Sequence, residues 1–291
     1  MRSLELLTSR SATHDVPLVV SIVGGGGKTT LLFALASDAR RNGATVLVTT
    51  TTRIYDPRDE GRTFDAFLAN EAWVIQPHHV QTTGIHLPSP AEAGFPAVAN
   101  GTDGFICVVG AGIETVAGLE PGSVTGANPG KLVAVVPALI DAAAGWDLIL
   151  VEADGARHLP LKAPAEHEPV VPASSRVVIA VIGLDCLGKP LDASIAFRPE
   201  LVARATGLEP GGIIETRHLV ALASAEAGCF KGTPAGAFRV LLLNKLDLAD
   251  QAVARAVAAA VLESGAADLV ALGTLNVDSS DQRIAVLLKR D

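Results

Sequence analysis

The chain has 291 residues, of which 49% are hydrophobic and 19% charged, so it is long and apolar enough to bury a large core. Its formal net charge of −8 argues against nonspecific binding to nucleic acid or to a membrane surface. The sequence shows neither the apolar core of a signal peptide nor a stretch of membrane-spanning length, and its three cysteines lack a CxxC pair, so we expect a cytoplasmic protein with reduced thiols.

Short apolar runs separated by helical patterns dominate the chain. The runs are continuous rather than alternating, which is typical of central strands covered on both faces. They lie at 18–23, 45–50, 147–152, 177–183, 239–244 and 268–273. Apolar residues recur at helical spacing in 29–43, 131–145, 216–228 and 250–265. This order predicts an α/β fold, namely a doubly wound, mostly parallel sheet with helices on both faces.

Residues 55–130 fit this alternation less well. The segment is rich in glycine and proline and has few helical patterns, but it holds short β-like runs at 73–76 and 105–110. We therefore expect a β-rich insertion after the second strand, within a single domain spanning residues 1–291. The proline-rich stretch 158–172 is expected to be a loop.

A glycine-rich turn joins the first predicted strand to the first predicted helix. It reads Gly24, Gly25, Gly26, Gly27, Lys28, Thr29, Thr30. The unpaired amides and positive dipole of a helix N-terminus favour an anion, and glycines let phosphate oxygens approach the backbone. Lys28 would add a charge for the outer phosphates, and Thr29 a hydroxyl for Mg²⁺. We predict a shortened P-loop, GxxGKT, that binds ATP or GTP and resembles the loop of Mur-type ligases; a plain glycine turn is the alternative.

Two acidic residues, Glu152 and Asp154, follow the apolar run at 147–151. Ligands of such sheets bind at the carboxyl ends of the strands, and residues two apart in an extended chain face the same side. One carboxylate is expected to hold Mg²⁺ while the other orients the attacking water or a substrate. The alternative is an N-cap or turn.

The run at 239–244 ends in an NKxD element made of Asn244, Lys245 and Asp247. A carboxylate at the fourth position would accept hydrogen bonds from guanine N1–H and N2–H₂, a pair that adenine lacks. The lysine stem would lie along the base. These residues therefore predict guanine recognition, with a helix-capping turn or an unselective base site as the alternatives.

The threonine run that ends the second strand leads into Arg53. Thr51 or Thr52 would sense the γ-phosphate and Arg53 would stabilise charge on it or on a second substrate. The threonines also suit a strand without any such role.

A dense polar loop follows Asp154. It contains Arg157, His158, Lys162, Glu166 and His167. Because the loop leaves an acidic strand end, we interpret it as a clamp for an anionic second substrate or cofactor; a solvated connector is the alternative. The histidines and Glu166 would also suit a metal, but their spacing is not diagnostic.

These motifs together resemble the selenium-dependent molybdenum hydroxylase accessory proteins of the YqeC type. The matching stretches are VGGGGKTTLLFALA, VTTTTRI, LVEADGARHLPLKAPAEHEPVVP, VIGLDCLGKPLD, RPELVA and LNKLD, in order from about residue 18 to 250. The resemblance implies a P-loop NTPase fold and a role in maturing or inserting the cofactor of such a hydroxylase. It implies site roles for the P-loop glycines, Lys28, Thr29, Glu152, Asp154 and residues 157–168.

The sequence therefore predicts a Mg²⁺-dependent, nucleotide-hydrolysing accessory protein. Its partners would be a nucleoside triphosphate and a molybdenum hydroxylase client or that client's cofactor. Two alternatives remain open, an ATP-dependent ligase or kinase and a non-catalytic nucleotide-dependent switch.

Overall fold

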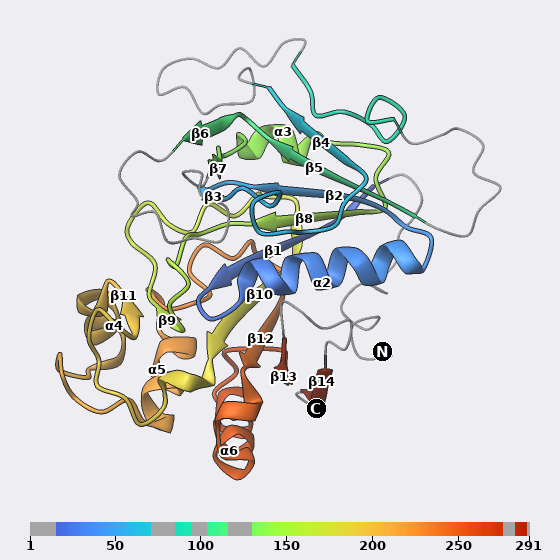
Figure 1. The fold of residues 1–291 in the computed structure, drawn as a ribbon. Coiled ribbons are helices and arrows are strands. Elements are labelled where there is room, and N and C mark those ends of the chain that lie inside the picture. The colour runs from blue at the N-terminus through green and yellow to red at the C-terminus, as the bar shows by residue number, and fades with distance from the viewer. Residues whose placement is uncertain (1–15, 71–84, 95–103, 116–129, 276–282, 290–291) are drawn as a thin grey trace.

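A large twisted sheet forms the centre of the protein (Figure 1). The computed structural model describes residues 16–70, 85–94, 104–115, 130–275 and 283–289. The nine strands of the sheet are β1 (Leu18–Gly24), β2 (Thr45–Thr50), β4 (Ala66–Ala69), β5 (Phe105–Gly110), β8 (Leu148–Glu152), β10 (Ser175–Gly183), β12 (Phe238–Asn244), β13 (Leu269–Thr274) and β14 (Arg283–Lys289). Their spatial order is β14-β13-β12-β10-β1-β8-β2-β5-β4. Among these neighbours only β13 and β14 pair antiparallel, so the predicted mostly parallel sheet is confirmed.

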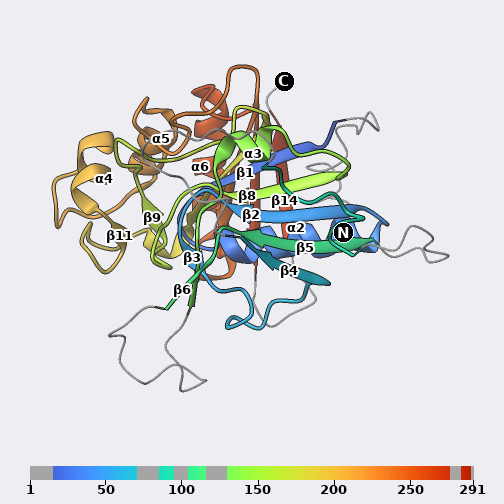
Figure 2. The ribbon, with the colours of Figure 1, turned by 90° about the horizontal axis from the view of Figure 1, so that it is seen from above.

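Helices cover both faces of this sheet, as Figures 1 and 2 show. They are α2 (Lys28–Arg41), α3 (Pro137–Asp141), α4 (Pro199–Thr206), α5 (Thr216–Ser224) and α6 (Gln251–Glu263), with short 3₁₀ turns η2 (Leu184–Cys186) and η3 (Leu246–Leu248). Alternate residues of a strand point to opposite faces. In β8, Leu148 and Leu150 therefore pack into the core under α2, whereas Ile149 and Val151 pack into the core under α3. A third core lies between the sheet and α4, α5 and α6.

Helix α2 starts directly after the glycine turn. Gly27 is its N-cap residue and offers no capping side chain, while Arg40 and Arg41 lie in its last turn. Cationic side chains at this end oppose the negative pole of the helix dipole. Gly43, with φ 84°, then reverses the chain into β2. The sequence pattern predicts this helix to within two residues at each end.

The segment predicted as an insertion is only partly separate from the sheet. Strands β4 and β5 extend the main sheet beyond β2 through parallel pairing. A separate three-stranded sheet is formed by β3 (Ile54–Tyr55), β7 (Gly130–Leu132) and β6 (Ile113–Thr115). The run at 105–110 is therefore a strand of the core sheet, and the run at 73–76 lies outside the described residues.

The predicted helix at 131–145 is wrong over most of its length. Lys131 and Leu132 belong to β7, where they pair with β3 and β6, and only Pro137–Asp141 form a helix. Proline fixes its own φ and disfavours a helical conformation in the preceding residue, so Pro137 begins the helix instead of continuing one. The apolar spacing that suggested a longer helix comes from two different elements.

Several small elements lie beside the carboxyl ends of the central parallel strands (Figure 1). They are the β3-β7-β6 sheet and a parallel pair of β9 (Leu161–Lys162) with β11 (Ala196–Phe197). Apart from β9, the stretch 158–172 is irregular, as predicted. Among the helices in the described ranges, none combines the length and apolar character needed to cross a membrane.

Candidate functional site

A cavity of about 820 Å³ opens at the carboxyl ends of the central parallel strands. Its wall includes Gly26, Gly27, Lys28, Thr29, Thr30, Arg53, Glu152, Arg157, His158 and His167, all predicted site residues. Tyr55, Glu60, Arg62, Lys131, Glu168, Phe197 and Arg198 also line it. Carboxyl ends of parallel strands are the usual ligand-binding edge of such sheets. The cavity therefore joins the glycine turn to the predicted polar loop.

The first three glycines of the turn are held by the protein itself. Both carboxylate oxygens of Asp154 accept from the Gly24 amide at 3.1 Å. The amides of Gly25 and Gly26 donate to the carbonyl oxygens of Val181 and Leu159, each at 2.8 Å. A Cβ atom on Gly24 would overlap the Val181 carbonyl, and φ is positive there, so glycine is required.

The first amides of α2 are the ones left for an anion. An α-helix provides no intrahelical partner for its first N–H groups, and a glycine N-cap supplies no side chain to replace one. These amides belong to Lys28, Thr29 and Thr30, three residues that line the cavity. Phosphate oxygens therefore fit at the helix N-terminus, while the earlier glycines shape the turn.

The ammonium group of Lys28 lies beneath the turn. It donates to the Gly24 carbonyl oxygen at 2.8 Å and lies 3.4 Å from Asp154 Oδ1 and 3.6 Å from Glu152 Oε1. The Lys28 and Glu152 side chains are only 4% and 5% exposed, so these charges interact in a poorly solvated environment. The arrangement gives the turn one buried cation facing two carboxylates.

Thr29 and Glu152, two of the three residues predicted as Mg²⁺ ligands together with Asp154, contact each other. The Thr29 hydroxyl donates to Glu152 Oε2 at 2.9 Å. Burial raises the pKa of Glu152; Lys28 and the Thr29 hydrogen bond oppose this effect, and the charges of Asp154 and Glu60 add to it. A divalent cation would favour the ionised carboxylate, so this hydroxyl and carboxylate fit a magnesium ion chemically. No group of three or more His, Cys, Asp or Glu within the described ranges is arranged to hold a metal.

Asp154 faces the protein interior and is not part of the cavity wall. Besides the Gly24 amide and Lys28, it pairs with Lys162 at 3.2 Å. Lys162, whose side chain is fully buried, also contacts Glu168 at 2.8 Å and donates to the Gly155 carbonyl at 2.6 Å. Its ammonium group is therefore engaged with the protein, and Lys162 does not line the cavity as the predicted clamp requires.

Glu168 continues this chain of ion pairs toward the cavity surface. Arg198 Nη1 lies 2.7 Å from the same Glu168 oxygen that Lys162 contacts. Burial opposes ionisation of Glu168, but the hydrogen bonds and charges of Lys162 and Arg198 outweigh it and lower the pKa of the carboxyl. Alternating charges thus run from Arg198 through Glu168, Lys162 and Asp154 to Lys28.

The NKxD residues divide between two environments. The Asn244 side-chain amide donates to the Gly26 carbonyl at 2.8 Å, and its oxygen accepts from the Leu275 amide at 3.0 Å. Asn244 thereby connects β12 to the glycine turn. Lys245 pairs with Asp185 at 2.6 Å, and the carboxylate of exposed Asp247 accepts from the Thr274 hydroxyl at 2.8 Å. None of the three lines the cavity, and guanine recognition stays a prediction.

The threonine run supports the backbone, and Thr51 and Thr52, the predicted γ-phosphate sensors, also line the cavity. The hydroxyl groups of Thr50 and Thr51 donate to the carbonyl oxygens of Glu152 and Val170. Arg53 lines the cavity but is well exposed and pairs with Glu114 at 3.0 Å. The polar loop is also divided, because His167 reaches the cavity wall, whereas exposed Glu166 does not.

Aromatic rings and cations line the outer part of the cavity. Tyr55 stacks on His158 with 4.7 Å between ring centroids, and Lys131 Nζ lies 5.4 Å from the Tyr55 ring centre. Arg157 and Arg198 lie over the Phe197 ring at 5.0 and 4.6 Å. Tyr55, Lys131 and Phe197 are not among the site residues predicted from the sequence. Tyr55 and Phe197 lie in two-residue strands, and Lys131 lies in the wrongly predicted helix.

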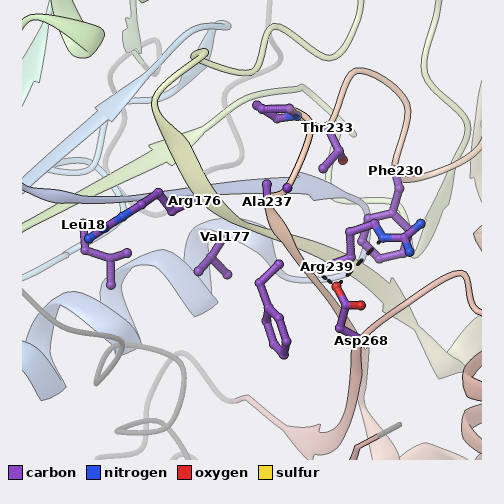
Figure 3. Close-up of a pocket in the computed structure, with 11 residues that line it drawn as sticks. Leu18, Arg176, Val177, Phe230, Thr233, Ala237, Arg239 and Asp268 are labelled. Atoms are coloured by element: carbon purple, nitrogen blue, oxygen red, sulfur yellow. Dashed lines mark hydrogen bonds and ion pairs between the residues drawn. The ribbon is translucent and has the colours of Figure 1, made fainter.

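A second cavity, of about 790 Å³, lies at the opposite edge of the sheet (Figure 3). Its wall includes Leu18, Val177 and Phe238, which lie near the amino ends of their strands. Arg239 and Asp268 form its visible polar contact, and the Arg239 amide donates to Asp268 at 2.8 Å. No predicted site residue lines this cavity.

Comparison with known proteins places the chain among relatives. The model of the YqeC protein family matches residues 20–200. The Uncharacterized protein YqeC of Escherichia coli (strain K12) is 42% identical over 132 residues, which cover 44% of this chain and 52% of that protein. The aligned part thus spans about half the length of this curated relative. No solved structure matches the chain. Because the family model covers more than half of the chain, including the glycine turn, the acidic strand end and the polar loop, the chain belongs to the YqeC protein family.

Proposed function

We propose that this protein binds a Mg²⁺–nucleoside triphosphate, ATP or GTP, at the glycine turn and hydrolyses it as an accessory protein. The observation that carries the proposal is the convergence of Lys28, Thr29 and Glu152 on one cavity at the start of α2. A helix N-terminus, a buried ammonium group and a hydroxyl–carboxylate pair together suit a polyphosphate with its metal.

Each group has a distinct role in this proposal. The amides at the start of α2 bind phosphate oxygens, and Lys28 offsets their negative charge in a poorly solvated site. Thr29 and Glu152 would hold Mg²⁺, which when bound supplies charge stabilisation to the phosphoryl group. Asp154 holds the Gly24 amide and Lys28 in position. Arg53, on the cavity wall, would stabilise charge on the outer phosphate.

The proposed biological role is maturation of a selenium-dependent molybdenum hydroxylase, through activation, transfer or insertion of selenium or of the molybdenum cofactor. This part of the proposal rests on the resemblance of the chain to such accessory proteins. If nucleotide turnover is coupled to delivery, hydrolysis is slow in the isolated protein and faster with the client. Binding without appreciable turnover under both conditions would favour a nucleotide-dependent switch.

A second candidate is phosphoryl transfer or ligation to an acceptor. The supporting observation is that the cavity continues past the glycine turn to Tyr55, His158 and Phe197, which leaves a lined space beyond the start of α2. Product analysis separates the two reactions. A kinase or ligase consumes nucleotide in proportion to a modified acceptor, whereas a hydrolase releases inorganic phosphate without one.

The deciding experiment measures affinity for fluorescent ATP and GTP analogues with and without Mg²⁺, and phosphate release from the natural nucleotides. We expect Lys28→Ala to lose most triphosphate affinity and all hydrolysis, because one positioned ammonium group opposes several phosphate charges. Lys189→Ala, which removes an exposed lysine outside the cavity, is the matched control.

Circular dichroism must accompany this test, since removing Lys28 leaves two buried carboxylates without their shared cation. A folded Lys28→Ala protein that turns over nucleotide at the wild-type rate would contradict the proposal. So would a wild-type protein with no measurable affinity for either triphosphate.

A further inference from the structure

The cavity is positively charged although the protein is acidic. Six cationic side chains line it, namely those of Lys28, Arg53, Arg62, Lys131, Arg157 and Arg198, against the three carboxylates of Glu60, Glu152 and Glu168. The whole chain carries a formal charge of −8. Clefts lined by one sign of charge concentrate ligands of the opposite sign. Cations are therefore gathered here against the overall charge of the molecule.

Two of these cations, Arg157 and Lys131, have no carboxylate partner within the part of the chain that the structure describes. Their described contacts are with aromatic rings, Arg157 over Phe197 and Lys131 over Tyr55. The other cations of the wall lie within ion-pair distance of acidic groups; Arg198, for example, pairs with Glu168. Arg157 and Lys131 therefore keep their donors for a ligand.

The backbone around this group is held in an unusual conformation. Arg157, His158 and Arg198 have φ values of 50°, 61° and 60°, in the left-handed region that non-glycine residues rarely adopt. Such residues persist only where surrounding contacts fix them, and they concentrate at ligand-binding sites. Here the Leu159 amide closes the turn onto the Ala156 carbonyl, and buried Lys162 donates to the Gly155 carbonyl. The turn that presents Arg157 is thus anchored.

We propose that Arg157 and Lys131 form an oxyanion site for a second ligand, a molecule that carries a carboxylate or phosphate group and is distinct from the nucleotide. Both cations line the same cavity as Tyr55 and His158. Lys131 lies over Tyr55, Tyr55 stacks on His158, and His158 follows Arg157 in the chain. Arginine offers a planar fork of donors that matches either kind of oxyanion.

The identity of the second cation is the main departure from the sequence-based hypothesis. That hypothesis paired Arg157 with Lys162, but the ammonium group of Lys162 is buried among Asp154, Glu168 and the Gly155 carbonyl. Lys131 comes from β7, in a segment far from the polar loop in sequence, and it lines the same cavity. The proposal rests on the proposed function only in assigning the glycine turn to nucleotide.

The single tyrosine of the chain provides a direct test. Because Tyr55 lies in the site, incorporation of 3-fluorotyrosine gives one ¹⁹F resonance that reports on it. The labelled protein is first saturated with Mg²⁺ and a non-hydrolysable ATP or GTP analogue, so that the glycine turn is filled. It is then titrated separately with inorganic phosphate and with malonate, at constant ionic strength.

We expect a saturable shift with at least one probe, and the stronger probe identifies the ligand as a phosphate or a carboxylate. Arg157→Gln and Lys131→Gln should each weaken this binding about tenfold, the usual consequence of losing one charged hydrogen bond. Affinity for the nucleotide analogue should stay within about twofold of wild type. Arg255→Gln, which removes an exposed arginine of α6, is the control and should bind the probes normally.

Absence of a saturable shift with either probe in the nucleotide-filled protein would overturn the oxyanion site, as would wild-type affinity in both glutamine variants. Failure of the nucleotide analogue to bind at all would instead contradict the proposed function. In that case the titration is repeated on Lys28→Ala protein without nucleotide. Binding that persists there and weakens with Arg157→Gln supports the oxyanion site independently, whereas its absence overturns the site too.

Discussion

Lys162 and Asp154 form an ion pair of 3.2 Å in which neither side chain is more than 2% exposed. Since Asp154 also accepts the Gly24 amide, Lys162 acts on the glycine turn through Asp154. A lysine of the polar loop thereby helps to hold Asp154 against Gly24, the last residue of β1. The polar loop and the glycine turn are connected through these contacts, so a substitution in the loop is expected to alter the conformation of the turn.

Replacement of Lys162 by methionine tests this support. Lys162→Met leaves Asp154 and Glu168 without their shared buried cation, and breaking a buried pair from one side typically costs about 3–5 kcal/mol. We expect a loss of this order in the free energy of unfolding, measured by urea denaturation. Lys189→Met, at an exposed position, should change it little. Equal stability of the two variants would show that the buried pair has no structural role.

Acid sensitivity follows from the lowered pKa of Glu168. Burial raises the pKa of this carboxyl, but the hydrogen bonds and charges of Lys162 and Arg198 lower it by more and favour the ionised form. A folded pKa below the unfolded value of about 4.3 gives stability that is present above that value and lost as pH falls through the folded pKa. Glu168→Gln should therefore be less stable than wild type at pH 7, and the difference should shrink in acid. Denaturation curves from pH 7 to pH 3 measure this; a constant difference would argue against the linkage.

The pKa of Glu152 is shifted in the opposite direction from that of Glu168. Burial raises its pKa, so its ionised form costs stability above the unfolded pKa, and the folded state gains stability as pH falls through the folded pKa. Glu152→Gln should accordingly raise the melting temperature of the nucleotide-free protein at neutral pH. The same variant should lose the Mg²⁺-dependent part of stabilisation by nucleotide, because it lacks the anionic ligand. Thermal unfolding with and without Mg²⁺–nucleotide measures both effects, and a destabilised apo variant would contradict the first.

Base selectivity is the prediction attached to Asp247. In the structure its carboxylate accepts from the Thr274 hydroxyl. If this carboxylate also accepts hydrogen bonds from guanine, Asp247→Asn should weaken GTP binding by about 1.5–3 kcal/mol and leave ATP binding unchanged. The reason is that the carboxylate only accepts hydrogen bonds, whereas the asparagine amide would present an N–H donor toward the donors of guanine. Competition titrations with both nucleotides measure the change. A wild-type preference for ATP would reassign Asp247 to a structural role beside Thr274.

The three cysteine thiols should not react with thiol reagents in the folded protein. Cys107, Cys186 and Cys229 are free and buried, and burial raises the pKa of each to about 12. A thiol rather than a thiolate is then present at pH 8, and it is also inaccessible. Ellman's reagent should detect no thiol in the native state and all three after denaturation. Rapid labelling of native protein at any one of them would indicate local opening.

The sequence was sufficient to predict six of the nine strands of the main sheet, because those six are continuous apolar runs. It did not predict β4 or β14, and the run that forms β5 was assigned to an insertion. The six predicted strands are present, with ends displaced by at most two residues. The glycine turn was also predictable, since its residues are consecutive and their chemistry is local. Lys28, Thr29 and Glu152, which were expected to meet, do lie together.

The outer half of the cavity could not be predicted in the same way. Tyr55 and Phe197 belong to strands of two residues, which are too short to show any periodicity. Lys131 lies within a run whose apolar spacing imitates a helix, and its pairing with β3 and β6 is a tertiary contact. The burial of Lys162 was equally hidden, because a lysine in a proline-rich loop is usually solvated.

The bond between the Asn244 side chain and the Gly26 carbonyl has a consequence for how the protein is made. The two residues are 218 positions apart, and Asn244 lies beyond residues 20–200, the part matched by the family model. During synthesis the side-chain amide that donates to the Gly26 carbonyl emerges from the ribosome 218 residues after the glycine turn. If the turn binds a nucleotide as proposed, nascent chains that stop short of Asn244 are expected to bind it more weakly than chains that include this residue.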